Sequence, residues 1–159
     1  MKIMNKFQKK LANRKKDNKG FSLVELIIVI AIMAILVGIV GTQVIPYISK
    51  SKVAKDQQVL NSISTAAVAA YSENGATSNM TIDVFGTAPS DPTAAKIQTD
   101  IKTASGYDDL AAFKNALGSD AGENVTTVTV TFDSATHKAT TSVTPVDPKY
   151  PIKDVEATL

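Results

Sequence analysis

Glu25 is the only charged side chain within a long apolar segment, residues 21–45, and its carboxylate is the group here that most needs a chemical partner. An ionised carboxylate inside a membrane span costs about 2.5–3.5 kcal/mol or more, so it usually has a partner. As a helix, the segment would extend ~37 Å and cross a hydrocarbon core of roughly 30 Å. The sequence therefore predicts a membrane-crossing helix with a paired Glu25. A plain signal-anchor, in which Glu25 reaches the cytoplasmic interface, is the alternative.

A strongly basic end precedes this segment. Residues 1–20 hold eight basic side chains and one acidic one, a net +7, whereas residues 21–159 hold nine basic and fourteen acidic ones, a net −5. A basic flank stays in the cytoplasm when an apolar segment enters a membrane. Nucleic-acid binding is the other use of such a cluster. The apolar run that follows at once favours the membrane, so no nucleic acid is predicted as a direct partner.

The junction between the two parts reads KGFSLVE at residues 19–25 and continues as IIVIAIMAILVGIV. It resembles the N-terminus of type IV pilins and their pseudopilin relatives. Those families have a basic leader ending in Gly, a cleavage site, an aromatic first mature residue, Thr or Ser, and Glu as the fifth mature residue. The resemblance covers residues 14–45 closely and the rest of the chain only in outline.

Gly20 and Phe21 are the expected cleavage site. Gly20 has no Cβ and offers an uncrowded backbone to a peptidase, although a lone glycine is also an ordinary turn before a helix. A cut here would remove the leader and keep the apolar helix, whereas a secretory signal peptide is cut after its apolar core, near Gly38–Gly41 in this chain. The new α-amino cation on Phe21 could then pair with Glu25 of the same chain or of a neighbouring chain.

The resemblance implies a route from membrane to fibre. A prepilin peptidase cuts after Gly20 and N-methylates Phe21, and an assembly platform and an ATPase then extract subunits from the cytoplasmic membrane into a homo-oligomeric helical filament. It implies a structural subunit, a pilin that could be the major one, of an extracellular type IV pilus for adhesion, motility or biofilm formation. A pseudopilin of a type II secretion or DNA-uptake (competence) system is the first alternative. A signal-anchored surface binding domain is the second.

The remaining chain is expected to divide into an amphipathic helix, residues 46–74, and a globular head, residues 75–159. The helix predictably ends near Asn74-Gly75, and its beginning is weakened by Gly38, Gly41 and Pro46. Its apolar stripe recurs at helical spacing. The stripe consists of Val53, Leu60, Ile63, Ala67 and Tyr71.

In the head, alternation predicts strands at 80–85, 128–132 and 137–144, the last two forming a β-hairpin. Helices are expected after Asp91-Pro92 and over 108–117, with Asp108 as the N-cap of the second, and a polar turn at 119–124. Three prolines predict an irregular tail anchored by Tyr150 and Ile152. The fold class is therefore α+β and pilin-like. A long N-terminal helix, transmembrane in its first half and amphipathic in its second, packs on a small antiparallel sheet.

No catalytic residue, metal or cofactor is predicted, and the chain is not expected to be an enzyme. It has no cysteine and a single histidine, His137, at the start of an expected strand. The acidic residues near 108 and 120 do not match the spacing of a calcium loop. Three features depart from the family pattern: the leader is long, Thr42 occupies the place of the usual helix-breaking proline, and the cysteine pair that fastens the C-terminal region is missing. How that region is held is therefore left open by the sequence.

Overall fold

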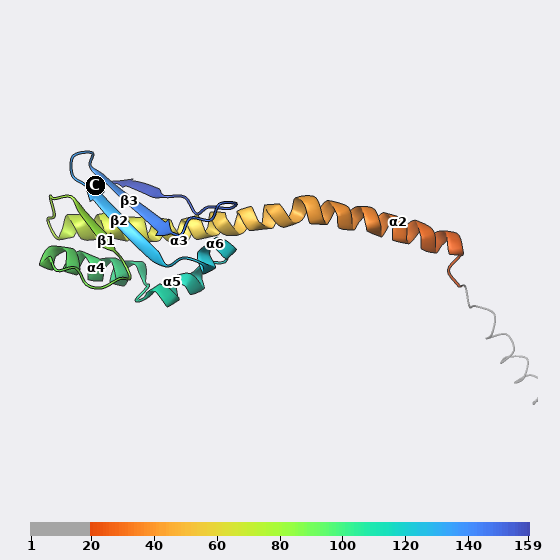
Figure 1. The fold of residues 1–159 in the computed structure, drawn as a ribbon, viewed down its shortest axis with the longest axis horizontal. Coiled ribbons are helices and arrows are strands. Elements are labelled where there is room, and N and C mark those ends of the chain that lie inside the picture. The colour runs from red at the N-terminus through yellow and green to blue at the C-terminus, as the bar shows by residue number, and fades with distance from the viewer. Residues whose placement is uncertain (1–19) are drawn as a thin grey trace, which may run out of the picture. The chain divides into compact units, whose positions relative to one another are not determined.

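The computed structural model describes residues 20–159 (Figure 1). The basic leader, up to residue 19, lies outside the described residues. The remaining chain forms two compact units that divide between Val44 and Ile45. Helical backbone runs from Leu23 to Glu73 over 51 residues, as the sequence predicts, and it is long and apolar enough at its start to cross a membrane.

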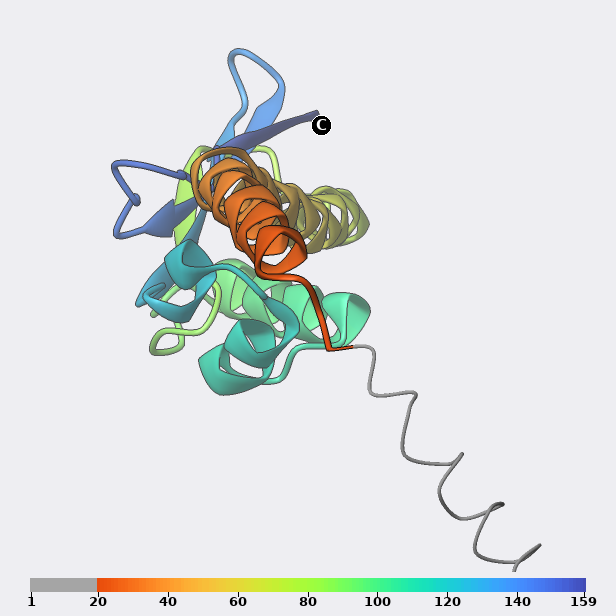
Figure 2. The ribbon, with the colours of Figure 1, turned by 90° about the vertical axis from the view of Figure 1, so that its right-hand side faces the viewer.

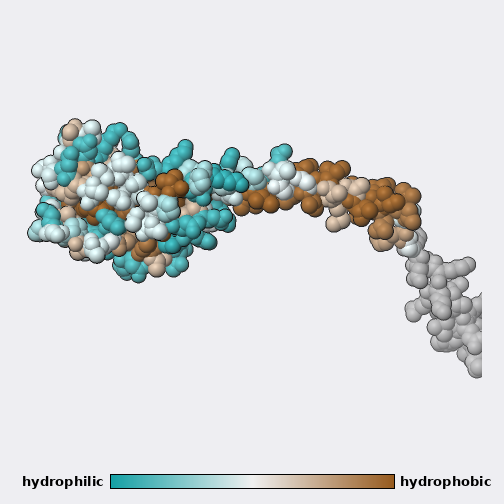
Figure 3. Space-filling model, in the orientation of Figure 1, coloured by the Kyte–Doolittle hydropathy of each residue, from teal (hydrophilic) through white to brown (hydrophobic). Residues whose placement is uncertain are grey.

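The first unit contains α2 (Leu23–Ile39) and the π-helical turn η2 (Val40–Val44). No residue of α2 is buried. Apart from Glu25, the side chains of this helix are apolar, and the face visible in Figure 3 is mostly brown. A helix that is apolar all round is stable only when lipid or other protein covers it.

The second unit begins with α3 (Ile45–Glu73), which carries the predicted stripe. Leu60, Ile63 and Ala67 are fully buried, whereas Val53 is only half-buried. The helix ends at Glu73, and Gly75 follows with a φ of 60°, a left-handed conformation that glycine adopts without strain. The expected boundary near residue 74 is thereby confirmed.

A four-stranded antiparallel sheet packs on α3. It consists of β1 (Met80–Asp83), β2 (Thr127–Asp133), β3 (Lys138–Thr144) and β4 (Val155–Thr158), in spatial order β1-β2-β3-β4. The register places Val130 of β2 opposite Ile82 of β1 and Thr141 of β3. Every second side chain of β2 and β3 points inward and is buried, and all of these are apolar except Thr141. The predicted hairpin and its apolar face are confirmed.

Three further helices complete the head: α4 (Pro92–Ser105), α5 (Leu110–Ala116) and the single-turn α6 (Asp120–Glu123). Figure 2 shows α4 and α5 on one side of α3 and the β2–β3 turn on the other. Asp91 caps α4, as predicted, by accepting a hydrogen bond from the Ala94 amide at 2.8 Å. The prediction for α5 was wrong by one residue, because Asp109 rather than Asp108 accepts from the Ala112 amide.

The expected polar turn at 119–124 contains α6 instead. Its Ala121 and Gly122 are buried because this turn closes on α3, and a Cβ at Gly122 would lie 2.6 Å from the Leu117 Cβ. Asp56 of α3 is the reason for this closure. Its fully buried carboxylate accepts hydrogen bonds from the amides of Gly118 (2.8 Å) and Ser119 (3.0 Å), and also from the Ser119 hydroxyl.

The tail is irregular over residues 145–154, as its three prolines predict, but it then ends in β4, which was not predicted. Before β4, two hydrogen bonds join the tail to α3. The Gln57 side chain donates to the Lys153 carbonyl at 2.7 Å and accepts from the Lys153 amide at 2.9 Å, in the manner of a neighbouring strand. Ile152 is buried, as predicted, whereas Tyr150 is only half-buried. His137 does not begin β3 but lies in the β2–β3 turn with a φ of 53°.

Candidate cleavage and assembly site

The expected cleavage site lies just outside the first helix. Gly20, Phe21 and Ser22 are not helical, and Ser22 is extended with φ −62° and ψ 142°. Phe21 is 86% exposed, and apart from the adjacent residues no atom lies within 4 Å of the position where a Cβ on Gly20 would stand. The bond between Gly20 and Phe21 is therefore accessible and free of helical hydrogen bonding.

Ser22 and Glu25 form a capping box that sets the start of α2. The Ser22 amide donates to the Glu25 Oε2 at 2.8 Å, and the Val24 amide donates to the Ser22 hydroxyl at 3.4 Å. These bonds satisfy donors that a helix N-terminus otherwise leaves unpaired. Glu25 thus has a partner within its own helix end, where the helix dipole also favours a carboxylate.

Sequence reasoning missed this role of Ser22, although its signal is present. The spacing Ser-x-x-Glu immediately before an apolar run is the pattern of a capping box. The expected pairing of Glu25 with the Phe21 α-amine stays a prediction, because the uncleaved chain carries an amide at Phe21. The box occupies Oε2 and leaves the second carboxylate oxygen available to a cation.

The three residues expected to weaken the helix surround the π-helical turn. Gly38 and Gly41 lie on either side of its start at Val40, and Pro46 follows its end at Val44. The Thr42 hydroxyl donates to the Gly38 carbonyl at 3.0 Å. A proline in a helix lacks an amide donor, and its ring clashes with the carbonyl four residues before it. The wider π-helical turn before Pro46 relieves this clash. The loss of helical hydrogen bonds at 38–46 in a filament stays a prediction.

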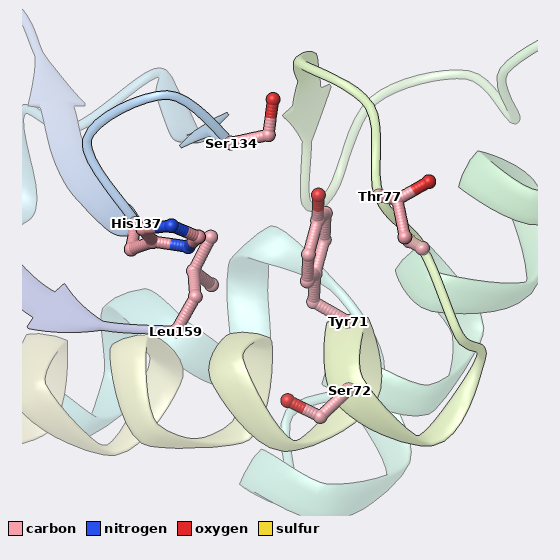
Figure 4. A pocket seen from close by; sticks show the side chains of 7 residues that line it. Tyr71, Ser72, Thr77, Ser134, His137 and Leu159 are labelled. Atoms are coloured by element: carbon pink, nitrogen blue, oxygen red, sulfur yellow. The ribbon is translucent and has the colours of Figure 1, made fainter.

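A hollow of about 300 Å³ lies elsewhere, at the end of the head near the β2–β3 turn (Figure 4). His137 and Tyr71 line it, together with Ser134 and Thr77. The Tyr71 hydroxyl donates to the Ser78 carbonyl at 3.0 Å. Within residues 20–159, no group of three or more His, Cys, Asp or Glu side chains is arranged to hold a metal ion.

Residues 15–41 match the family model described as the prokaryotic N-terminal methylation motif. This match contains the Gly20-Phe21 bond, the capping box and most of the apolar helix. No curated protein and no solved structure matches the chain. The chain therefore carries the class III signal peptide motif of type IV pilins, and the motif with the α+β fold supports a prepilin or pseudopilin of the type IV pilin kind.

Proposed function

We propose that the chain is a structural subunit of a type IV pilus, and that the major pilin is the first role to test. It is cut after Gly20 by a prepilin peptidase, N-methylated at Phe21 and polymerised through its N-terminal helix. Before assembly it lies in the cytoplasmic membrane as a single-pass protein. An assembly platform and an ATPase then move it into an extracellular fibre used for adhesion, motility or biofilm formation.

The observation that carries this proposal is the methylation motif at residues 15–41, placed at an accessible junction. The Gly20-Phe21 bond precedes the first helix. Every residue from Gly20 to Ile45 is exposed, and most of them are apolar. So much apolar surface needs a covering of lipid or of other apolar helices. Both environments exclude water, so one helix suits the membrane and a filament core alike.

The capping box explains how the Glu25 carboxylate is stabilised in either environment. A buried carboxylate without hydrogen bonds is strongly unfavourable, and Ser22 supplies one bond before any processing takes place. Cleavage adds an α-amino cation at Phe21, one residue before the cap. A second copy can then bring its Phe21 amine to the free oxygen of Glu25, which would set the axial position of neighbouring subunits.

Intact-mass analysis of material sheared from cells tests the proposal. The expected species begins at Phe21 and carries one N-methyl group, and it occurs in long extracellular filaments. Sheared protein that retains Met1 would refute the processing step and favour a signal-anchored surface domain. Processed protein that stays with the cells and is missing from sheared fibres would instead favour a pseudopilin, which shares the motif.

A further inference from the structure

We propose that the neck of one subunit binds the base of the head of a second copy through opposite charges. The neck is defined as residues 45–55, the first part of α3, and the base as Asp120 and Glu123 of α6. This inference rests on the proposed function, because it describes how proposed filament subunits contact each other above their apolar helices.

All charged side chains of the neck are positive. Its three lysines, Lys50, Lys52 and Lys55, are exposed. No acidic residue occurs between Glu25 and Asp56. At 3.6 residues per turn, Lys52 and Lys55 are neighbours on one side of the helix. The neck thus has a net charge of +3 and presents two adjacent ammonium groups to solvent.

Asp56 stands four residues after Lys52, the usual distance for an ion pair along a helix, but it is not available. Its carboxylate is fully buried and accepts hydrogen bonds from Gly118 and Ser119. Among residues 20–159 the only ion pair joins Lys138 and Glu156, at 2.7 Å. Within residues 20–159, none of the neck lysines therefore forms an ion pair in its own subunit.

The head has the opposite charge. Residues 56–159 hold six basic and thirteen acidic side chains, a net −7. Asp120 and Glu123 are exposed, and α6 packs against α3 beside the loop that binds Asp56. They are thus acidic groups at the level where the neck ends at residue 55 and α3 enters the head, and Figure 1 shows α6 at this end of the head.

A second copy is the partner that this charge pattern fits. Parallel packing of the apolar helices brings several necks together, and like charges placed against each other across an interface are strongly unfavourable. The neck and the base are two different patches on one chain, so their contact is heterologous. Heterologous contacts that do not close into a ring generate open helical filaments, which is the assembly proposed above.

Charge-reversal variants of the full chain, produced in cells that lack the wild-type subunit, test this contact. The first is K52E/K55E, the second is D120K/E123K, and the third combines all four changes. We expect each double variant to reduce the yield of sheared filaments by roughly tenfold or more, because like charges then meet at the interface. Both should remain processed and membrane-inserted, with a protease-resistant head.

Restoration of filaments distinguishes contacts between chains from contacts within a chain. The fourfold variant should assemble, because its charges are exchanged and still complementary. Co-production of the two double variants should also restore filaments, now containing both chains. Rescue by the fourfold variant without rescue by the mixture would place the contact within one chain and overturn the inference. Normal filaments from K52E/K55E alone, or failure of both rescues, would overturn it too.

A matched control separates this contact from total charge. K96E/K149E makes the same charge change at two exposed head lysines and should leave the filament yield unchanged. Loss of K52E/K55E from the membrane fraction, rather than from filaments, would make anionic lipid headgroups the partner and contradict the inference. Wild-type protein that is uncleaved or forms no filaments would refute the proposed function itself, which the mass analysis detects independently.

Discussion

Removal of the Asp56 carboxylate should detach the α5–α6 corner of the head from α3. This carboxylate is fully buried and receives three hydrogen bonds, from the amides of Gly118 and Ser119 and from the Ser119 hydroxyl. In Asp56→Ala all three donors lose their acceptor, and the two donors of Ser119 remain buried. In Asp56→Asn one oxygen survives, but the new amide group faces backbone donors that it cannot satisfy.

The magnitude follows from the number of bonds lost. A hydrogen bond to a charged group contributes about 1.5–3 kcal/mol, so three independent bonds would give roughly 5–9 kcal/mol. The bonds share one carboxylate, and Gly118 is exposed, so water can replace part of the loss. We therefore expect Asp56→Ala to lower the free energy of unfolding by about 3–5 kcal/mol and Asp56→Asn by roughly 2 kcal/mol. Ser119→Ala, which removes one donor, should lose about 1 kcal/mol.

Urea unfolding of the full chain in detergent measures these differences. The chain has four tyrosines and no tryptophan, so tyrosine fluorescence and far-ultraviolet circular dichroism are the suitable signals. With an m-value of roughly 2 kcal/mol/M, Asp56→Ala should move the midpoint by about 2 M. Hydrogen exchange should show faster exchange at the amides of Gly118 and Ser119. A midpoint within about 0.5 M of wild type, with both amides still protected, would refute this reasoning.

Three further perturbations have expected outcomes. Glu25→Ala should leave the protein in the membrane fraction but impair filament formation, because the carboxylate proposed to pair with the Phe21 amine is gone; electron microscopy of sheared material measures this. Gln57→Ala should lower the free energy of unfolding by about 1–2 kcal/mol, since two neutral hydrogen bonds to Lys153 are lost, and limited proteolysis should cut residues 145–154 faster. Hydrogen bonds lower the pKa of Asp133 from its ordinary 3.8. The largest effect comes from the Thr136 hydroxyl, and the amides of Ala135 and Thr136 add to it. The stabilising effect of these bonds is therefore present above pH 3.8 and is lost as the pH falls through the lower pKa of the folded state, and thermal melting of wild type should depend more steeply on pH below 4 than that of Asp133→Asn.

Each of these outcomes has a control. Normal filaments from Glu25→Ala would exclude the pairing role, whereas loss of that variant from the membrane would point to an insertion defect. Gln58→Ala changes the exposed neighbour of Gln57 and should stay within about 0.5 kcal/mol of wild type; equal effects of the two variants would contradict the contact with Lys153. Identical pH dependence of wild type and Asp133→Asn would show that the turn makes no contribution that depends on Asp133 ionisation.

Most of the helices and strands could be predicted from the periodicity of apolar residues in the sequence. The stripe on α3 and the alternation in β2 and β3 report burial directly, because side chains of one face recur every 3.6 or every 2 residues. Strand β4 escaped this reasoning, since its four residues are half-buried or exposed and follow a run of prolines. Helix α6 escaped it as well, because a single turn is too short for a period and depends on Asp56, more than 60 residues away along the chain.

At the site, residue identities were predictable but their hydrogen bonds were less so. Gly20, Phe21 and Glu25 were singled out by the resemblance of residues 19–25 to the pilin N-terminus and by the lone carboxylate in an apolar segment, and their roles stay predictions. The bond from the Ser22 amide to Glu25 depends on where the helix begins, and helix ends are poorly determined by propensity alone. The charge contrast between neck and base appears only when α6 is placed beside α3.

The two hydrogen bonds between Gln57 and Lys153 have a consequence for how the head folds in the cell. Hydrogen bonds, the β4 pairing and the apolar packing of Ile152, Val155 and Leu159 hold the tail in place, and the sequence contains no cysteine. Folding of the head therefore requires no thiol oxidase and no disulfide isomerase, and thiol reductants have no bond in it to break. Its stability should be the same in oxygenated and in strictly anoxic surroundings, which leaves the subunit independent of the redox state of the compartment where it is assembled.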